Sequence, residues 1–144
     1  MPALHIGHVY RHSGFYLDQR TGELKAKFLV ALAYTPGGDI VARLLTSRQH
    51  GRPENPPCYH GDPYPGYYVG VLIGVLGAKS WVVLNKLDDL DDGDAARLMR
   101  VGILTETLTL PKDLIRPLLE CVARADDTTH LQERAIRDQL ANLP

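Results

Sequence analysis

The sequence has few of the features that stabilise small secreted proteins or cross membranes. Its 144 residues include only two cysteines, Cys58 and Cys121. Two cysteines cannot build a framework of several disulfides, so we expect a reducing compartment, the cytoplasm. Residues 1–10 lack the apolar core of a signal peptide. The longest apolar run, 67–78, is 12 residues long and contains three glycines, whereas a membrane-spanning helix needs about 20. We therefore expect a soluble protein with no membrane partner.

Aromatic residues are missing from the last part of the chain. Every Tyr and Phe precedes the one Trp, Trp81, and five of the six His lie at or before His60. The net charge of −1 hides a second division: residues 1–87 carry nine Lys/Arg and five Asp/Glu, and residues 88–144 carry seven and twelve. The length and the hydrophobic fraction of 44% fit one folded domain over 1–144. Its front part is basic and aromatic, and its back part is acidic.

The front part, 1–87, has the periodicity of strands. Residues 25–34 are almost all apolar, 36–39 (Pro-Gly-Gly-Asp) form a turn, and 40–46 continue as a second strand, which predicts a hairpin. Further short strands are expected at 6–11, 15–17, 69–76 and 80–85. Short strands with close turns are typical of a small, strongly bent antiparallel β-barrel of the SH3-like or another partly open type.

The back part, 88–144, has the spacing of helices. Three are expected, near residues 94–101, 114–122 and 130–140. Asp91 or Asp92 caps the first, and Thr129 with Gln132 forms a capping box for the third. Pro117 fits the second only in its first turn, so that helix should begin near Leu114. Residues 103–110 fit either a strand or a helix. The predicted fold class is α+β, a barrel followed by about three helices.

The apolar faces of these helices have two interpretations. They pack on the barrel, or Leu131, Ile136 and Leu140 form part of a dimer or partner surface.

A long proline-rich loop, 48–66, follows the strand that ends in Thr46 and Ser47. Basic and aromatic residues lie in this loop and in the segments before and after it: Lys25, Lys27, Arg43, Arg48, Arg52, Tyr59, Tyr64, Tyr67 and Tyr68. Basic groups contact phosphates and tyrosines stack on bases, which suits single-stranded RNA. Cleavage without a metal also needs a proton acceptor and donor, for which the sequence offers His50 or His60. Alternatively, the loop is only solvated, and its tyrosines pack against prolines.

A metal site is a second hypothesis for this loop. Cys58, His60 and Asp62 are possible ligands, with three more histidines upstream: His5, His8 and His12. The sequence has no Cys-x-x-Cys pair, and strand alternation would point His5 and His8 to opposite faces. As a nucleophile, Cys58 would have His60 nearby, but no third group orients the pair.

Two further patterns resemble ligand loops only superficially. Gly66, Gly70, Gly74 and Gly77 lack the phosphate-loop sequence and a helix after it. The acidic run 88–94 lacks a glutamate at the twelfth position of a calcium loop, so we expect helix capping there. We predict no metal and no cofactor.

Three segments resemble the MazF/PemK-like toxin family. They are KAKFLVAL at 25–32, LTS at 45–47 and SWVVLNKL at 80–87, and the likeness extends over about residues 5–122. The resemblance implies an SH3-like barrel, usually dimeric, that cleaves single-stranded RNA without metal and is held inactive by an antitoxin protein. Lys27 lies where the family has its catalytic arginine, and Thr46 lies on its active-site threonine, with Ser47 beside it.

These observations lead to one hypothesis and two alternatives. The leading hypothesis is a cytoplasmic, homodimeric endoribonuclease toxin. Its expected catalytic residues are Lys27, Thr46, Ser47, Arg48, His50 and His60. Its expected RNA-binding residues are Lys25, Arg43, Arg52, Tyr59, Tyr64, Tyr67 and Tyr68. The first alternative is a non-catalytic barrel that binds RNA or a protein partner through residues 48–68, and the second is a metal-binding domain that uses Cys58 and His60.

Overall fold

The computed structural model describes residues 2–72 and 77–144. In this part of the chain, six strands are followed by one helix, a seventh strand and two further helices. The strands are β1 His8–Leu17, β2 Leu24–Tyr34, β3 Ile40–Thr46, β4 Cys58–Tyr59, β5 Gly66–Val71, β6 Lys79–Val83 and β7 Leu104–Thr109. The helices are α1 Asp92–Arg100, α2 Lys112–Ala123 and α3 His130–Ala141. The predicted strand 69–76 is present as far as Val71, and its end at 73–76 lies outside the described residues.

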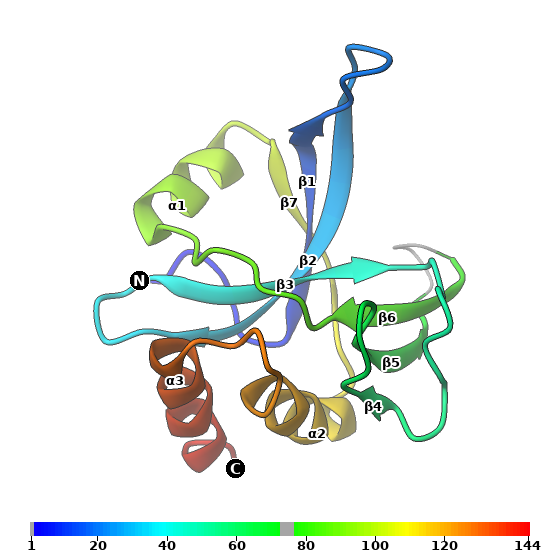
Figure 1. The fold of residues 1–144 in the computed structure, drawn as a ribbon. Coiled ribbons are helices and arrows are strands. Elements are labelled where there is room, and N and C mark those ends of the chain that lie inside the picture. Colours follow the sequence, from blue (N-terminus) through cyan, green and yellow to red (C-terminus); the bar gives the residue numbers. More distant parts are fainter. Residues whose placement is uncertain (1, 73–76) are drawn as a thin grey trace.

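The strands form one antiparallel sheet in the order β4-β5-β6-β3-β2-β1-β7. The predicted α+β class is confirmed. The described strands do not close into a barrel, because β4 and β7 stand at opposite ends of this order. In Figure 1, β1 and β7 run along one direction, whereas β3 and β6 run across it. The long strand β2 pairs with β1 on one side and with β3 on the other, and its pairing with β3 has a register irregularity between Ala31 and Ala33. The sheet is therefore strongly bent but open.

Local sequence signals located most element ends correctly. The β2–β3 hairpin turns between Thr35 and Asp39, whose backbones are hydrogen-bonded. Asp91 caps α1 by accepting a hydrogen bond from the amide of Asp94, and Thr129 with Gln132 forms the expected capping box of α3. The two strands expected near the N-terminus are one strand, β1, with an irregularity between His12 and Tyr16.

The predicted start of the second helix was wrong. Helix α2 begins at Lys112 rather than near Leu114, so Pro117 lies beyond its first turn. Because proline has no amide hydrogen, the carbonyl of Asp113 loses its normal partner in the helix. The segment whose structure the sequence left open is strand β7.

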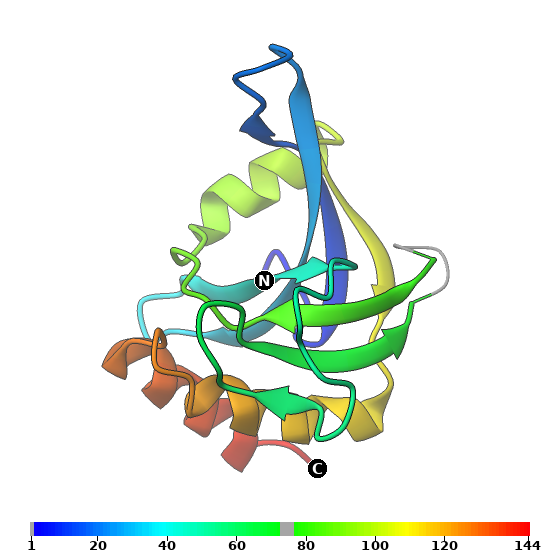
Figure 2. The ribbon, with the colours of Figure 1, turned by 45° about the vertical axis from the view of Figure 1, so that its right-hand side comes forward.

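Two hydrophobic cores lie on opposite faces of the sheet. On one face, Val30 and Leu45 pack with Leu118 of α2 and Ile136 of α3; we call this the closed face. On the other face, Leu29 and Ala42 pack with Ala95 of α1. Figure 2 shows α2 and α3 along one side of the sheet, with α1 on the opposite side.

The expectation that the helices pack on the sheet is confirmed, with one exception. Ile136 is buried and Leu140 packs against the core of the closed face, so neither is a free partner surface. Leu131, the third residue of that proposed surface, is 53% exposed.

Candidate nucleic-acid interface

Three polar side chains form one row across the sheet, on the face that carries α1. His12 of β1 pairs directly with Lys27 of β2. The last pair between β2 and β3 is Phe28 with Leu45, and continuing this register by one residue puts Lys27 opposite Thr46 of β3. Paired residues in an antiparallel sheet point to the same face. The sheet therefore brings His12, Lys27 and Thr46 together, although they are far apart in the sequence.

The part of this face outside the α1 core is accessible. Lys27 and Thr46 are each half-buried, and neither belongs to the α1 core. Tyr16 is 44% exposed and pairs with Lys25, which places both on the same face as Lys27. We call Tyr16, Lys25, Lys27 and Thr46 the open face.

The Lys27 ammonium group is held above an aromatic ring. Its Nζ lies 5.4 Å from the centroid of the Tyr16 ring, within the range of a cation–π interaction. This contact orients the charge without neutralising it. Lys25 differs, because its ammonium donates to Glu23 at 3.1 Å. Lys27 is therefore better placed than Lys25 to attract a phosphate.

Thr46 ends strand β3 with a local side-chain turn. Its Oγ1 accepts a hydrogen bond from the amide of Arg48 at 3.1 Å. The hydroxyl hydrogen remains able to donate to a ligand. Ser47 and Arg48 follow and are exposed. The end of the strand thus has an available hydroxyl group at Thr46, followed by an exposed serine and an exposed arginine.

His12 is the member of this row that the sequence did not indicate for RNA. Burial lowers the pKa of its imidazole, which favours the neutral ring. Nδ1 accepts a hydrogen bond from the amide of Gly14 at 3.3 Å, so a neutral ring carries its proton on Nε2. His12 and Lys27 are the last pair of β1 and β2 before the irregularity in β1. No local sequence pattern indicates where this irregularity lies, so the pairing could not be predicted.

Arg43 was wrong as an RNA contact. Its side chain is fully buried on the closed face. The guanidinium donates to the carbonyl of Ala42 at 2.8 Å, to Oε1 of Gln132 at 2.9 Å and to Oγ1 of Thr128 at 3.3 Å. Burial lowers the pKa of this group. Arg43 is a structural link between β3 and the start of α3.

Arg52 and Tyr67 were also wrong as surface contacts, since each is 3% exposed. Arg52 donates to the carbonyls of Arg48 at 2.9 Å and Pro65 at 3.2 Å, and burial lowers its pKa. These bonds fasten the two ends of the long loop to each other. Tyr67 belongs to the core of the closed face.

The other aromatic residues of the loop are more accessible. The rings of His50 and Tyr64 stack with centroids 4.4 Å apart and an interplanar angle of 16°. The Arg52 guanidinium lies 5.4 Å from the centroid of the same Tyr64 ring, which is 42% exposed. Tyr68 lies against buried Trp81, whose indole donates to the carbonyl of Pro53 at 3.0 Å. The loop is thus an ordered structure whose ring contacts centre on Tyr64.

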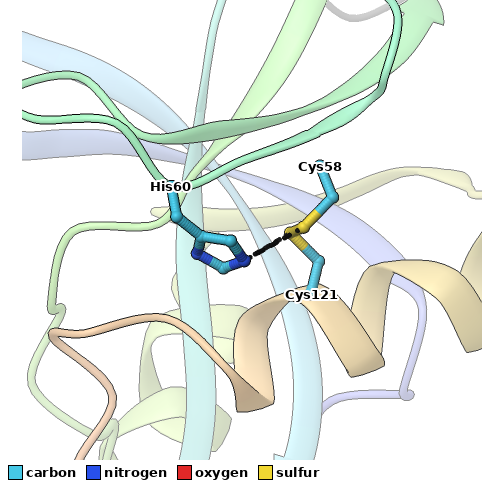
Figure 3. Close-up of side chains that lie close together, drawn as sticks. All are labelled: Cys58, His60 and Cys121. Atoms are coloured by element: carbon cyan, nitrogen blue, oxygen red, sulfur yellow. Dashed lines mark hydrogen bonds between the residues drawn. A yellow bond between two sulfur atoms is a disulfide. The ribbon is translucent and has the colours of Figure 1, made fainter.

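His60 lies on the other side of the sheet from Lys27. Its Nε2 is 3.1 Å from Sγ of Cys58, and Cys58 forms a disulfide with Cys121 of α2 (Figure 3). Cys58 packs against the core of the closed face. The structure therefore does not bring His60 together with Lys27 and Thr46. It also pairs the two cysteines in a disulfide, although the small number of cysteines led us to expect a reducing compartment.

The possible ligands of the metal hypothesis lie in a different arrangement from the one the sequence suggested. Among residues 2–72 and 77–144, the one group of three or more possible ligands within 4.8 Å of each other is Cys58, His60 and Cys121. Of the upstream histidines, His8 instead bonds through Nδ1 to Glu106 of β7. That bond lowers the pKa of the Glu106 carboxyl group.

The superficial ligand patterns have structural explanations. Gly77 precedes β6, a strand, where a phosphate loop would need a helix. The acidic run supplies the cap of α1 through Asp91.

Within the described residues, no helix combines the length and the apolar character of a membrane span. Comparison of the chain with protein-family models, curated proteins and solved structures found no match.

Proposed function

We propose that the protein is a metal-independent endoribonuclease that cleaves single-stranded RNA at the open face. The observation that carries this proposal is the position of Lys27 beside Thr46 on one accessible sheet face. An ammonium group and a hydroxyl group side by side suit a phosphodiester, because one neutralises charge and the other donates a hydrogen bond. By the resemblance to the MazF/PemK-like toxins, these two positions correspond to the family's catalytic arginine, replaced here by lysine, and to its active-site threonine.

The residues around this pair have different roles in the proposed cleavage reaction. In RNA cleavage without metal, the 2′-hydroxyl attacks the adjacent phosphorus and the 5′-oxygen leaves. Lys27 and Arg48 stabilise the negative charge that develops on the phosphate oxygens. Thr46 and the Nε2–H of His12 donate hydrogen bonds to those oxygens.

We assign proton transfer from the 2′-hydroxyl to the leaving 5′-oxygen to His50. This residue follows Thr46 by four positions and lies on an exposed part of the loop. We prefer His50 to His60, because His60 is held beside the disulfide on the closed face.

The biological setting forms part of the same proposal. The strongly bent open sheet is interpreted as an opened relative of the SH3-like barrel. By the same resemblance, the protein is a homodimeric toxin of a toxin–antitoxin system. It acts on RNA in the cytoplasm and is inhibited by a protein antitoxin.

A second function is favoured by the stack on Tyr64. The His50 and Tyr64 rings are held in an ordered, exposed arrangement that a base or a partner side chain can extend. This arrangement supports a non-catalytic protein that binds RNA or a protein partner through residues 48–68. Such a protein would bind RNA and leave it intact.

The test is incubation of the purified protein with a mixed RNA pool, with and without a chelator, followed by end mapping. The proposal predicts cleavage that survives the chelator and leaves 2′,3′-cyclic phosphate ends. Lys27→Ala and Thr46→Ala should each reduce the rate by about 10²- to 10³-fold, as for the loss of one preorganised donor to a developing anion.

Matched controls are Lys112→Ala on α2 and Thr105→Ala on β7, both exposed and both outside the open face. Their rates should equal that of the unmodified protein. The proposal fails if Lys27→Ala and Thr46→Ala cleave as fast as these controls. It also fails if the chelator abolishes cleavage, or if RNA is bound but stays intact.

A further inference from the structure

The Cys58–Cys121 disulfide lies beside an imidazole, which a purely structural disulfide does not require. Nε2 of His60 is 3.1 Å from Sγ of Cys58 and 3.9 Å from Sγ of Cys121. Figure 3 shows the His60 ring pointing its Nε2 at the two sulfur atoms, with Cys121 projecting from α2. Two sulfurs and one imidazole nitrogen within 4.8 Å of each other are a typical set of zinc ligands.

The distances from the imidazole nitrogen to the two sulfurs are close to those of a tetrahedral zinc site. Typical Zn–S and Zn–N bond lengths place a sulfur about 3.6 Å from a nitrogen and about 3.8 Å from a second sulfur. The two sulfur-to-nitrogen distances in the protein, 3.1 and 3.9 Å, lie on either side of the first value. Once the disulfide is reduced, the sulfurs need to separate by roughly 1.7 Å to make room for the ion.

The elements that hold the three ligands are well anchored. Cys121 is fully buried in α2, and Cys58 belongs to β4, which pairs with β5. His60 follows Cys58 by two residues, so one short segment supplies two of the ligands. The reduced site therefore does not depend on a mobile terminus or on a second chain.

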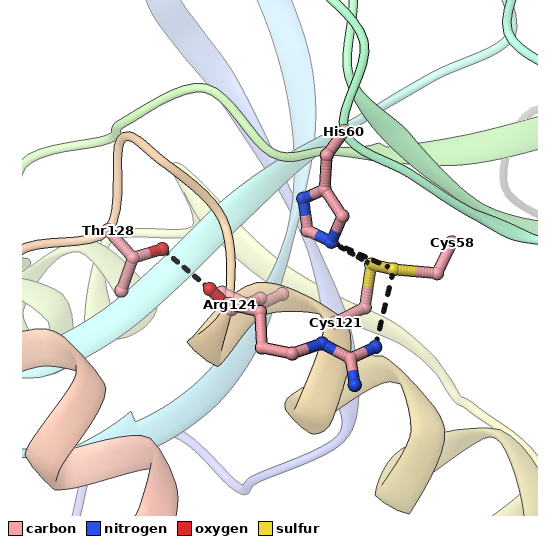
Figure 4. The surroundings of a disulfide bond; sticks show 6 residues. Cys58, His60, Cys121, Arg124 and Thr128 are labelled. Carbon is pink, nitrogen blue, oxygen red and sulfur yellow. Dashed lines mark hydrogen bonds between the residues drawn. A yellow bond between two sulfur atoms is a disulfide. The ribbon is translucent and has the colours of Figure 1, made fainter.

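The surroundings of the site suit two thiolates. Nη2 of Arg124, from the end of α2, lies 3.9 Å from Sγ of Cys58 (Figure 4). A guanidinium at this position stabilises negative charge on the sulfur. A zinc ion with two thiolates and a neutral imidazole has no net charge, so Arg124 does not repel the loaded site.

A small cavity beside His60 provides for the outer contacts of the site. Its volume is about 20 Å³, and Asp62 and Asp126 are among the residues that line it. That volume holds one water molecule. Histidines that bind zinc usually donate their second ring N–H to a carboxylate or a water. Carboxylates line the cavity beside His60 and it has room for one water, so its lining suits such a contact.

We propose that the reduced protein binds one zinc ion through Cys58, His60 and Cys121, and that the disulfide is the oxidised, metal-free state of the same site. A dithiol reductant first opens the Cys58–Cys121 disulfide. It passes two electrons and two protons to the two sulfurs, which become thiols, and is itself oxidised to a disulfide. Zinc then displaces the two thiol protons, which are released to solvent.

This site is independent of the proposed RNA cleavage, because Cys58 and Cys121 pack on the closed face and Lys27 lies on the open face. The redox state of the compartment decides which form is present. In a reducing cytoplasm, where structural disulfides are rare, the zinc form prevails.

The test uses the full chain, reduced with a phosphine so that no added thiol competes for metal. Cobalt(II) is then titrated in as a spectroscopic probe and displaced with zinc. We expect one cobalt per chain, with thiolate-to-cobalt charge-transfer absorption and the visible bands of tetrahedral cobalt. The chain with its disulfide intact, verified by thiol titration, should give none of these bands.

Variants locate the ion. His60→Ala should weaken cobalt binding by more than the roughly 10- to 100-fold that loss of an outer partner costs, and Cys58→Ser should remove the charge-transfer band from one sulfur. The control is His130→Ala, an exposed histidine at the start of α3. Circular dichroism verifies that each variant is folded.

If Cys58→Ser does not fold, His60→Ala decides the question alone. The proposal is overturned if the reduced chain binds no cobalt, or if it binds cobalt without thiolate absorption. It is equally overturned if His60→Ala binds cobalt as tightly as His130→Ala.

Discussion

The two faces of the sheet use basic side chains in opposite ways. Arg43 of β3 points into the closed face, where it is fully buried and donates three hydrogen bonds. Lys27 of β2 points to the open face, where its ammonium lies over the Tyr16 ring. Which side of a strand a residue occupies therefore decides whether its charge stabilises the fold or remains available to a ligand. The closed face should control stability, and the open face should control activity.

The disulfide on the closed face should give the largest effect on stability. It joins residues separated by 63 positions, and the chain-entropy model assigns a loop of this size about 4 kcal/mol. The double variant Cys58→Ala/Cys121→Ala should lose about that much free energy of unfolding relative to the oxidised protein. Urea denaturation measures the difference. A loss below about 1 kcal/mol would mean that the cross-link does not constrain the unfolded chain as this model requires.

Removal of the buried guanidinium should have the next largest effect. Arg43→Ala removes three hydrogen bonds from a buried site, leaves Oε1 of Gln132 with the Thr129 amide as its one remaining donor, and opens a cavity between β3 and α3, so we expect a loss of about 3 kcal/mol. The matched control is Arg48→Ala, which removes the same group from an exposed position and should change stability by no more than about 0.5 kcal/mol. Equal losses from both variants would contradict the division between the faces.

The smallest effect concerns His12 on the side of the sheet that carries Lys27. Because burial lowers its pKa in the folded state, the unfolded chain takes up the proton first as the pH falls below about 6.5. The protein should therefore lose stability from about pH 6.5 downward, more steeply than the His12→Gln variant, whose side chain does not titrate. Urea unfolding of both proteins at several pH values measures this difference. Parallel curves would show that His12 is not desolvated by the fold.

Elements defined by neighbouring residues could be predicted from the sequence. The β2–β3 hairpin follows from alternating apolar residues around a Pro-Gly-Gly-Asp turn, and the α3 start follows from Thr129 and Gln132. The start of α2 was missed because the helix tolerates Pro117 beyond its first turn. Packing of the apolar helix face on the sheet outweighs the one lost hydrogen bond.

Contacts between distant segments could not be predicted. The Cys58–Cys121 pair and the His12–Lys27 neighbours depend on how β4, α2 and β1 are placed in space. The burial of Arg43 had a weak signal, since it is the one charged residue in the strand 40–46. The side chain that would receive it, Gln132, lies 89 positions away. Lys27 and Thr46 were proposed as one site from a resemblance, and the register of β2 and β3 makes them neighbours.

The most direct test of the central claim is to map where single-stranded RNA contacts the folded protein. Backbone amide shifts in nuclear magnetic resonance spectra, recorded during titration with a short RNA, locate the contact residue by residue. The account predicts the largest shifts at residues 25–27 and 46–48, and their loss in Lys27→Ala. Shifts confined to α2, α3 and residues 58–60, with residues 25–27 unchanged, would contradict it.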